Sequence, residues 1–98
     1  MKWYIAGKIN GDPEYRDKFR AAEEAVRERD AEAVILNPAE LPEGMAPGDY
    51  IKICLSMLDS ADMAVFLPDW ISSAGAKIEH AYARYVGMRI AYLEQLAD

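Results

Sequence analysis

Strand-forming runs that alternate with helical patterns along the whole chain most constrain its fold. The expected strands cover residues 3–6, 33–36, 61–67 and 89–93. The expected helices have apolar residues at helical spacing; they begin near residues 12, 48 and 74 and end near residues 29, 58 and 86. Strict alternation with short connections favours a parallel sheet covered by helices on both faces, with right-handed crossovers.

Local signals mark the ends of these elements. Asp12 and Pro13 have the residue types of a helix N-cap and a first-turn proline, so they predict the start of the first helix. Gly87 is a natural residue to follow the end of the third helix. The side chains expected to form the buried stripe of that third helix are Ile78, Ala81, Tyr82, Tyr85 and Val86.

Length and composition fit one folded domain. The 98 residues include 52% hydrophobic and 29% charged side chains, which is ordinary for a globular protein and excludes a disordered chain. A chain of this size buries about two thirds of its unfolded surface, so it folds without a metal or a disulfide. We therefore predict that residues 1–98 form a single α/β domain. It is expected to be a three-layer αβα sandwich of the flavodoxin or Rossmann type, with a parallel sheet of four strands or five.

Net charge excludes one class of partner. The 17 acidic side chains outnumber the 11 basic ones, and the resulting charge of −6 repels a phosphate backbone. No cluster of Lys and Arg offsets this repulsion, so we expect no nucleic-acid polymer as a partner.

Cysteine use and hydropathy indicate the compartment. Cys54 is the one cysteine, and its place on a helical apolar face predicts a reduced, buried thiol. We expect no metal site, because the single histidine and the single cysteine lie in separate helices without ligand spacing, and no cofactor. No apolar run approaches the ~18 residues of a membrane span, and no signal-peptide pattern is present. We therefore expect a cytoplasmic protein without a membrane partner.

Topology predicts where a ligand would bind. In open parallel sheets, ligands lie beyond the carboxyl ends of the strands. Those ends fall at residues 7–11, 37–38 and 68–75, so we expect three loops to converge on one crevice. Glu79 is expected at the rim or floor of that crevice.

The stretch from Ser72 to His80 is the strongest local signal for a site. Small residues lead into a helix that starts near Ala74 or Gly75, and its free N–H groups and dipole attract anions. The same field favours the ionised form of Glu79, which is then a candidate nucleophile or stabiliser of a sugar cation. Alternatively, Glu79 only complements the helix dipole.

Other candidates carry weaker signals. The loop from Gly7 to Gly11 has two flexible positions and an ammonium, which suits a phosphate or sugar hydroxyl, although a plain turn explains it too. It is neither a dinucleotide fingerprint nor a P-loop. Trp70 is a candidate to stack on a nucleobase or a lid over the core. Tyr4 shares a strand face with Ala6 and has a buried core role as its alternative. His80 points about 100° away from Glu79, which favours a structural or surface role.

Three segments carry a resemblance to a known family: residues 4–9 (YIAGKI), 61–62 (AD) and 73–83 (SAGAKIEHAYA). With them the chain resembles the nucleoside 2-deoxyribosyltransferase superfamily over nearly all of its 98 residues. It looks closest to a small, largely uncharacterised subgroup associated with phages and bacteria, a domain of unknown function. Residues 37–42 and 52–54 are also similar to that subgroup.

The resemblance implies roles for individual residues. Glu79 matches the glutamate nucleophile of the family, and Tyr4 matches a tyrosine that orients it. Ser73 matches the position where transferases carry an aspartate and the deoxynucleotide hydrolase carries a serine. The candidate catalytic residues are Glu79 and Tyr4, and the candidate substrate-binding residues are Gly7, Lys8, Ile9, Asn10, Gly11, Asn37, Asp69, Trp70, Ser73 and Gly75.

Two departures from the family pattern concern the chemistry. The established enzymes carry an aspartate that aids the leaving group eight residues before the acidic residue of the third strand. Counted back from Asp62, that position here is Cys54, and a thiol is a poor substitute for a carboxyl group. Lys8 replaces a small hydroxyl residue of the hydrolase. The resemblance also implies a homo-oligomer, in which a neighbouring subunit completes the pocket.

The leading hypothesis from the sequence is an enzyme that cleaves or transfers the N-glycosidic bond of 2′-deoxyribonucleosides or their 5′-monophosphates. Hydrolysis of monophosphates is slightly favoured, because Ser73 and Lys8 resemble a phosphate site. A nucleotide-binding sensor or sequestering protein without turnover is the alternative, and a structural assembly subunit is a third hypothesis.

Overall fold

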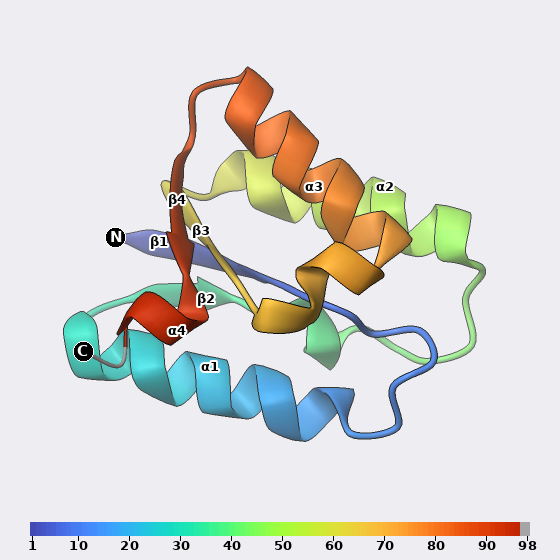
Figure 1. Cartoon of the computed structure of the whole chain (residues 1–98), viewed down its shortest axis with the longest axis horizontal. Helices are drawn as coiled ribbons and strands as arrows, with labels where there is room; N and C mark the ends of the chain where they lie inside the picture. Colours follow the sequence, from blue (N-terminus) through green and yellow to red (C-terminus); the bar gives the residue numbers. More distant parts are fainter. Residues whose placement is uncertain (97–98) are drawn as a thin grey trace.

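A four-stranded, all-parallel sheet forms the centre of the computed structural model, which describes residues 1–96 (Figure 1). The strand order is β2-β1-β3-β4. The strands are β1 (Lys2–Ala6), β2 (Val34–Leu36), β3 (Met63–Phe66) and β4 (Arg89–Tyr92). β1 and β3 lie in the middle of the sheet and are buried almost throughout, as expected for central strands of a covered parallel sheet.

Helices cover both faces of this sheet. The α-helices are α1 (Tyr15–Arg29), α2 (Pro47–Ser60), α3 (Ala74–Tyr85) and α4 (Leu93–Leu96), and the 3-10 helices are η1 (Pro38–Glu40) and η2 (Pro68–Ser72). Figure 1 shows α1 and α4 on one face and α2 and α3 on the other. The predicted αβα sandwich of the flavodoxin type is confirmed, with four strands and not five among residues 1–96. None of the helices in this part of the chain has the length and apolar character to cross a bilayer.

Each face of the sheet has its own hydrophobic core. Side chains alternate along β1, so Trp3 and Ile5 enter the core on the α1 side while Tyr4 and Ala6 enter the core under α2 and α3. The sequence pattern predicted this division. The core-facing residues of the two long helices are Phe19, Ala22 and Val26 in α1 and Cys54 and Leu58 in α2.

The order of the strands creates a switch point between β1 and β3. β1 pairs with β2 on one edge and with β3 on the other. From β1 the chain passes through α1 to β2, which pairs with one edge of β1. It then crosses back through α2 to β3, which pairs with the other edge of β1. The loops that follow β1 and β3 consequently separate above the carboxyl end of the sheet, which is the usual ligand-binding place in such folds.

The start of α1 differs from the prediction. Asp12 and Pro13 do not open the helix, which begins at Tyr15. The Asp12 carboxylate instead accepts a hydrogen bond from the Glu14 N–H at 2.9 Å, and so closes a turn before the helix. Its other oxygen lies 2.6 Å from the Lys18 ammonium. Both carboxylate oxygens of Asp12 therefore stabilise the loop before the helix. The predicted end of the helix at Arg29 is confirmed.

The buried face of α3 is the main error of the sequence interpretation. The helix starts at Ala74 and is followed by Gly87 at φ +77°, as predicted. Its core-facing residues, however, are Ala76, Glu79, His80 and Ala83. Ile78 is 51% exposed and Tyr85 is 93% exposed, so most of the predicted stripe faces outward, and of its five residues Tyr82 alone packs partly against the core. Glu79 and His80 can be buried because each has a hydrogen-bond partner inside the fold.

Candidate active site

A cavity of about 180 Å³ lies at the switch point, above the carboxyl ends of β1 and β3. Three segments build it: the loop after β1, the first half of α2, and the stretch from the end of η2 into α3. Its lining residues are Gly7, Lys8, Ile9, Asn10, Pro47, Tyr50, Ile51, Cys54, Ser72, Ser73, Ala74, Gly75, Ala76 and Glu79. From the α2 wall the resemblance indicates only Cys54; the sequence interpretation missed Pro47, Tyr50 and Ile51, because helical spacing does not reveal which part of a helix overhangs a sheet edge.

Glu79 and Tyr4 form the buried polar centre of this site. The Tyr4 hydroxyl donates a hydrogen bond to Oε2 of Glu79, across 75 positions of sequence. Glu79 is 5% exposed and lines the cavity, while Tyr4 is 1% exposed and supports it from the sheet below. With Oε2 occupied by Tyr4, Oε1 is the oxygen left for a ligand.

Burial controls the charge of Glu79. Loss of solvent raises the pKa of its carboxyl group from 4.5 to about 7, and the hydrogen bond from Tyr4 opposes this rise. The sequence indicated only the helix field, which favours the ionised form, and not the burial that favours the neutral form. Glu79 lies more than one turn inside α3, where the dipole acts weakly, and desolvation dominates. Near pH 7, both the charged and the neutral form of Glu79 are therefore present.

Cys54 lines the same cavity as Glu79, from the wall that α2 forms. Its side chain is buried, as predicted, and it comes from α2. Burial raises the pKa of its thiol, and the neighbouring Tyr4 hydroxyl partly opposes that rise. The pKa of Tyr4 is raised well above its ordinary value, by burial first and then by Glu79 and Cys54. Tyr4 therefore stays a protonated donor, and Cys54 stays a neutral thiol at physiological pH.

The N-terminus of α3 gives the cavity an anion-attracting end. Ser73 caps the helix, because its Oγ accepts the Ala76 N–H at 3.2 Å. The amides of Ala74 and Gly75 belong to the first turn, where no intrahelical acceptor exists, and both residues line the cavity. A Cβ on Gly75 would meet only Ile51, at 3.9 Å, so space does not require glycine there.

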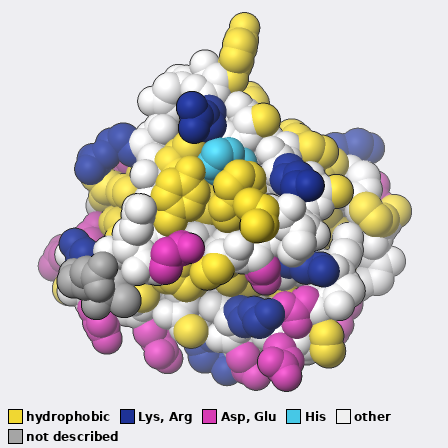
Figure 2. Space-filling model, viewed as in Figure 1, with side chains coloured by type: hydrophobic (Ala, Val, Ile, Leu, Met, Phe, Trp, Pro, Cys, Tyr) yellow, Lys and Arg dark blue, Asp and Glu magenta, His cyan; other side chains and the backbone are white. Residues whose placement is uncertain are grey.

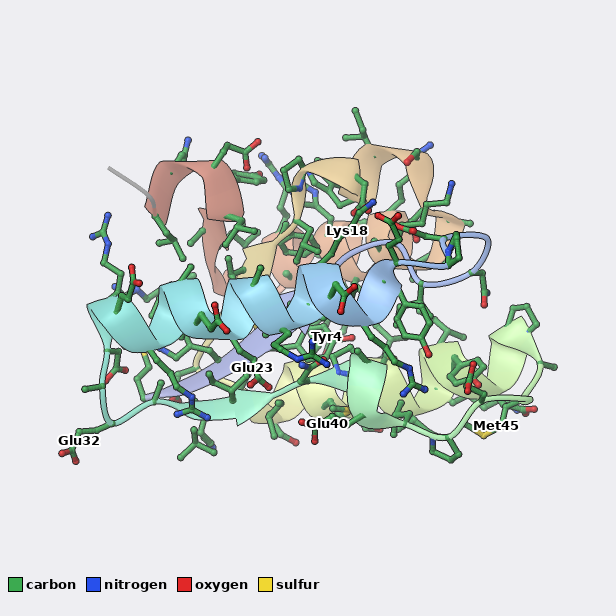
Figure 3. The ribbon with its side chains drawn as sticks, turned by 90° about the horizontal axis from the view of Figure 1, so that it is seen from below. Tyr4, Lys18, Glu23, Glu32, Glu40 and Met45 are labelled. Atoms are coloured by element: carbon green, nitrogen blue, oxygen red, sulfur yellow. The ribbon has the colours of Figure 1, made fainter. Side chains whose placement is uncertain are left out.

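The loop after β1 is held in place from outside the cavity. Oδ1 of Asp69 accepts the Lys8 N–H at 3.1 Å, and Oδ2 of Asp69 lies 3.8 Å from the Lys18 ammonium. Lys18 also binds Asp12 at the far end of the same loop. Asp69 thus supports the loop and is not among the residues that line the cavity. In Figure 3, Lys18 is labelled on α1 close to this loop.

Gly7 is the one glycine of this loop that space requires. A Cβ there would lie 3.0 Å from Cβ of Leu67 and 3.2 Å from Oδ1 of Asp69. We expect Gly7→Ala to lower the free energy of unfolding by about 1–3 kcal/mol, because the two loops must move apart. Gly48→Ala is the matched control, since a Cβ at Gly48 meets nothing within 4 Å. Urea unfolding of both variants checks this; equal stabilities would contradict the close contact.

Besides Asp69, the predicted ligand residues Asn37 and Gly11 also lie outside the cavity. Asn37 is used locally: its Oδ1 accepts the Ala39 N–H at 2.8 Å, and its Nδ2 donates to Glu23 at 3.0 Å. It lines a separate polar groove with Glu23 and Glu40, which are labelled in Figure 3. The expected convergence of three loops is therefore wrong for this loop, because η1 turns it toward α1. Gly11, at φ +82°, lines a second cavity described below.

Trp70 is also absent from the Glu79 cavity. Its ring stacks on His80, with centroids 3.9 Å apart and planes at 15°, and meets the edge of Phe66 at 5.9 Å. Nε2 of His80 lies 2.8 Å from the Tyr92 hydroxyl, and burial followed by Arg84 lowers the pKa of His80. Figure 2 shows hydrophobic side chains gathered around the histidine. The geometry matches a lid over the core, not a platform in the Glu79 cavity.

No group of three or more His, Cys, Asp or Glu side chains that could hold a metal occurs within residues 1–96. The polar centre of the cavity is instead the Glu79 and Tyr4 pair, with the Cys54 thiol and the α3 N-terminus beside it. This arrangement can present a carboxylate oxygen, held in place by Tyr4, and free amides to one small molecule.

Fold and site together define a flavodoxin-like α/β protein with a candidate small-molecule site at the switch point of its sheet. The chain belongs to the family described as "Domain of unknown function (DUF4406)", which matches residues 1–92. No curated protein matches the sequence.

A solved structure shares the fold. The 2-desoxiribosyltransferase from Leishmania mexicana superposes with a TM-score of 0.69 at 17% sequence identity. The match covers 93% of this chain and 62% of that enzyme, so the present chain spans less than two thirds of its length. At the level of the fold, this likeness agrees with the superfamily that the sequence resembles. Placement in the phage- and bacteria-associated subgroup stays a prediction.

Proposed function

We propose that the protein cleaves, or transfers, the N-glycosidic bond of 2′-deoxyribonucleoside 5′-monophosphates, with Glu79 as the nucleophile. One observation carries the proposal: a buried carboxylate lines the switch-point cavity, with Tyr4 holding one oxygen and the other left for a ligand. A purely structural glutamate would gain nothing from this placement, because burial raises its pKa and costs stability.

The reaction divides into two displacements. The ionised Glu79 attacks the anomeric carbon, a C–O bond forms, and the C–N bond breaks with its electron pair leaving on the base, which takes a proton. Water or a second base then attacks the same carbon, and the electron pair of the C–O bond returns to Glu79. Water loses its proton and gives hydrolysis; a second base gives transfer. Tyr4 orients the carboxylate throughout.

The mouth of the cavity favours a monophosphate over a bare nucleoside. The first-turn residues Ala74 and Gly75, with their free amides, and the residues Ser73 and Lys8 all line it. Helix N-termini and ammonium groups bind phosphate well, and the chain otherwise carries a charge of −6 that would repel it. We therefore propose the phosphate at the α3 end and the sugar over Glu79.

Cys54 supports a second candidate function. The leaving base needs a proton, and the residue at this position is a buried thiol whose pKa is raised. A site without a carboxylic acid at position 54 would bind the nucleotide and turn it over slowly or not at all. A nucleotide-binding protein without turnover is therefore the alternative. A cytoplasmic location and a homo-oligomer remain predictions.

Incubation with each of the four 2′-deoxynucleoside 5′-monophosphates, with and without a free acceptor base, tests the proposal. We expect free base from the wild-type protein, or an exchanged base when the acceptor is present, and neither from Glu79→Ala. Product is measured by liquid chromatography. Turnover no higher than in Glu79→Ala would contradict catalysis, and a thermal shift by nucleotides in that case would favour the binding function.

A further inference from the structure

A second cavity, of about 490 Å³, adjoins the Glu79 cavity. It lies between the loop after β1 and the loop that leads into α2, where Met45 is labelled in Figure 3. Ile9, Asn10 and Tyr50 line both cavities, so the two spaces are neighbours on either side of these residues. Its remaining lining residues are Gly11, Asp12, Pro13, Tyr15, Glu43, Gly44 and Met45.

Size argues that a nucleotide occupies both spaces. Small-molecule sites measure about 300–1,000 Å³. The Glu79 cavity, at about 180 Å³, falls below this range and holds only part of a sugar, phosphate and base. The second cavity brings the joined space within the range. Since the α3 N-terminus and Glu79 belong to the first cavity, the base is the part left for the second.

Tyr50 stands at the junction with its ring orientation fixed. Its hydroxyl donates to the Pro42 carbonyl at 2.6 Å and accepts the Met45 N–H at 3.3 Å. Both bonds hold the loop before α2, so the hydroxyl is occupied. What Tyr50 offers a ligand is therefore an aromatic surface, already ordered before binding.

Trp70, the platform that the sequence suggested, stacks on His80 instead, and the Tyr15 ring, which lines only the second cavity, is covered by the Arg16 guanidinium at 5.2 Å. Among the aromatic side chains of residues 1–96, Tyr50 alone lines both cavities. Ile9, Pro13 and Met45 add apolar surface around it, which suits a flat heterocycle better than a sugar or phosphate.

We infer that Tyr50 is the specificity-determining residue of this site, with its ring stacking on the base of the bound nucleotide in the second cavity. The inference rests on the proposed function, whose sugar and phosphate occupy the Glu79 cavity. A bicyclic purine covers more of the ring than a pyrimidine, so purine nucleotides are the preferred class.

Two probes separate the base from the rest of the ligand: 2′-deoxyadenosine 5′-monophosphate, and 2-deoxyribose 5-phosphate, which lacks a base. Binding is measured by calorimetry in the Glu79→Gln background, so that the nucleotide is not consumed. Base stacking on an aromatic side chain changes affinity by about 5- to 100-fold. We expect Tyr50→Leu to weaken the nucleotide by this factor and to leave the sugar phosphate within about twofold. Tyr50→Phe keeps the ring and should lose much less.

Tyr85→Leu is the matched control, since Tyr85 is 93% exposed and lines neither cavity. Unchanged nucleotide binding in Tyr50→Leu would overturn the inference. An equal loss for both probes would also overturn it, because Tyr50 would then only hold the loop. If the Glu79→Gln protein binds neither probe, the proposed function fails, and the inference fails with it. If that protein binds the nucleotide and Tyr50→Leu does not weaken this binding, the inference fails and the proposed function stands.

Discussion

Glu79→Gln is expected to abolish turnover and at the same time to stabilise the protein at pH 8. Loss of the nucleophile should lower the rate by about a thousand-fold or more. The glutamine amide fits the same space, and its oxygen still accepts the hydrogen bond from Tyr4. The variant removes a group that burial makes costly to ionise, so function and stability oppose each other at this position.

The pH dependence of this effect follows from the raised pKa of Glu79. Between pH 4.5 and about 7, the unfolded chain releases the proton and the folded protein keeps it, so wild-type stability falls as pH rises. Above pH 7 the penalty is complete, at about 3 kcal/mol. Below pH 4.5 it is absent.

Urea unfolding of wild type and Glu79→Gln at pH 4.5 and pH 8 measures this difference. We expect similar stabilities at pH 4.5 and a more stable variant at pH 8. The matched control is Glu28→Gln, an exposed residue of α1, which should change neither value. A variant less stable than wild type at pH 8 would show that the Glu79 carboxylate is not costly to bury.

Tyr4→Phe is expected to move the acid limb of the pH–rate profile upward by about one to two pH units. The hydroxyl opposes the rise in the pKa of Glu79, and hydrogen bonds to charged groups contribute about 1.5–3 kcal/mol. Without it the carboxylate loses its one fixed donor and is ionised only at higher pH. Rates measured from pH 5 to pH 9 check this.

Tyr92→Phe provides the control for that experiment. It also removes a half-buried hydroxyl from a hydrogen bond, but its partner is His80. Its profile should keep the wild-type acid limb. An unshifted limb in Tyr4→Phe, or an equal shift in Tyr92→Phe, would contradict the role of Tyr4 as the donor that tunes Glu79.

Periodicity was enough to predict the sheet, its parallel direction and the helices that cover it. It failed on α3, because hydrophobicity alone assigned the inward face. Glu79 and His80 face the core there because Tyr4 and Tyr92, both distant in sequence, supply their hydrogen bonds. Such pairing leaves no periodic trace in the local sequence.

The residues of the candidate site divide in the same way, into those that the order of strands and helices predicts and those that depend on tertiary packing. Ser73, Gly7 and Glu79 follow strand ends, so topology alone placed them at one edge of the sheet. The contributions of Tyr50 and Cys54 depend on how α2 packs across that edge, and the stacking of Trp70 on His80 depends on a short 3-10 helix that the sequence pattern did not indicate. Both are outcomes of tertiary packing.

The distance in sequence between Tyr4 and Glu79 also bears on how this protein acquires its chemistry. Their hydrogen bond joins the first strand to the last long helix, 75 positions apart. A contact of this separation forms late, because the loop it closes is nearly the whole chain. During synthesis of the chain, Tyr4 is made well before α3, so its hydrogen bond to Glu79 cannot form until α3 has been made. The raised pKa of Glu79 comes from burial, so it is a property of the folded chain, and an unfolded chain carries an ordinary glutamate at this position.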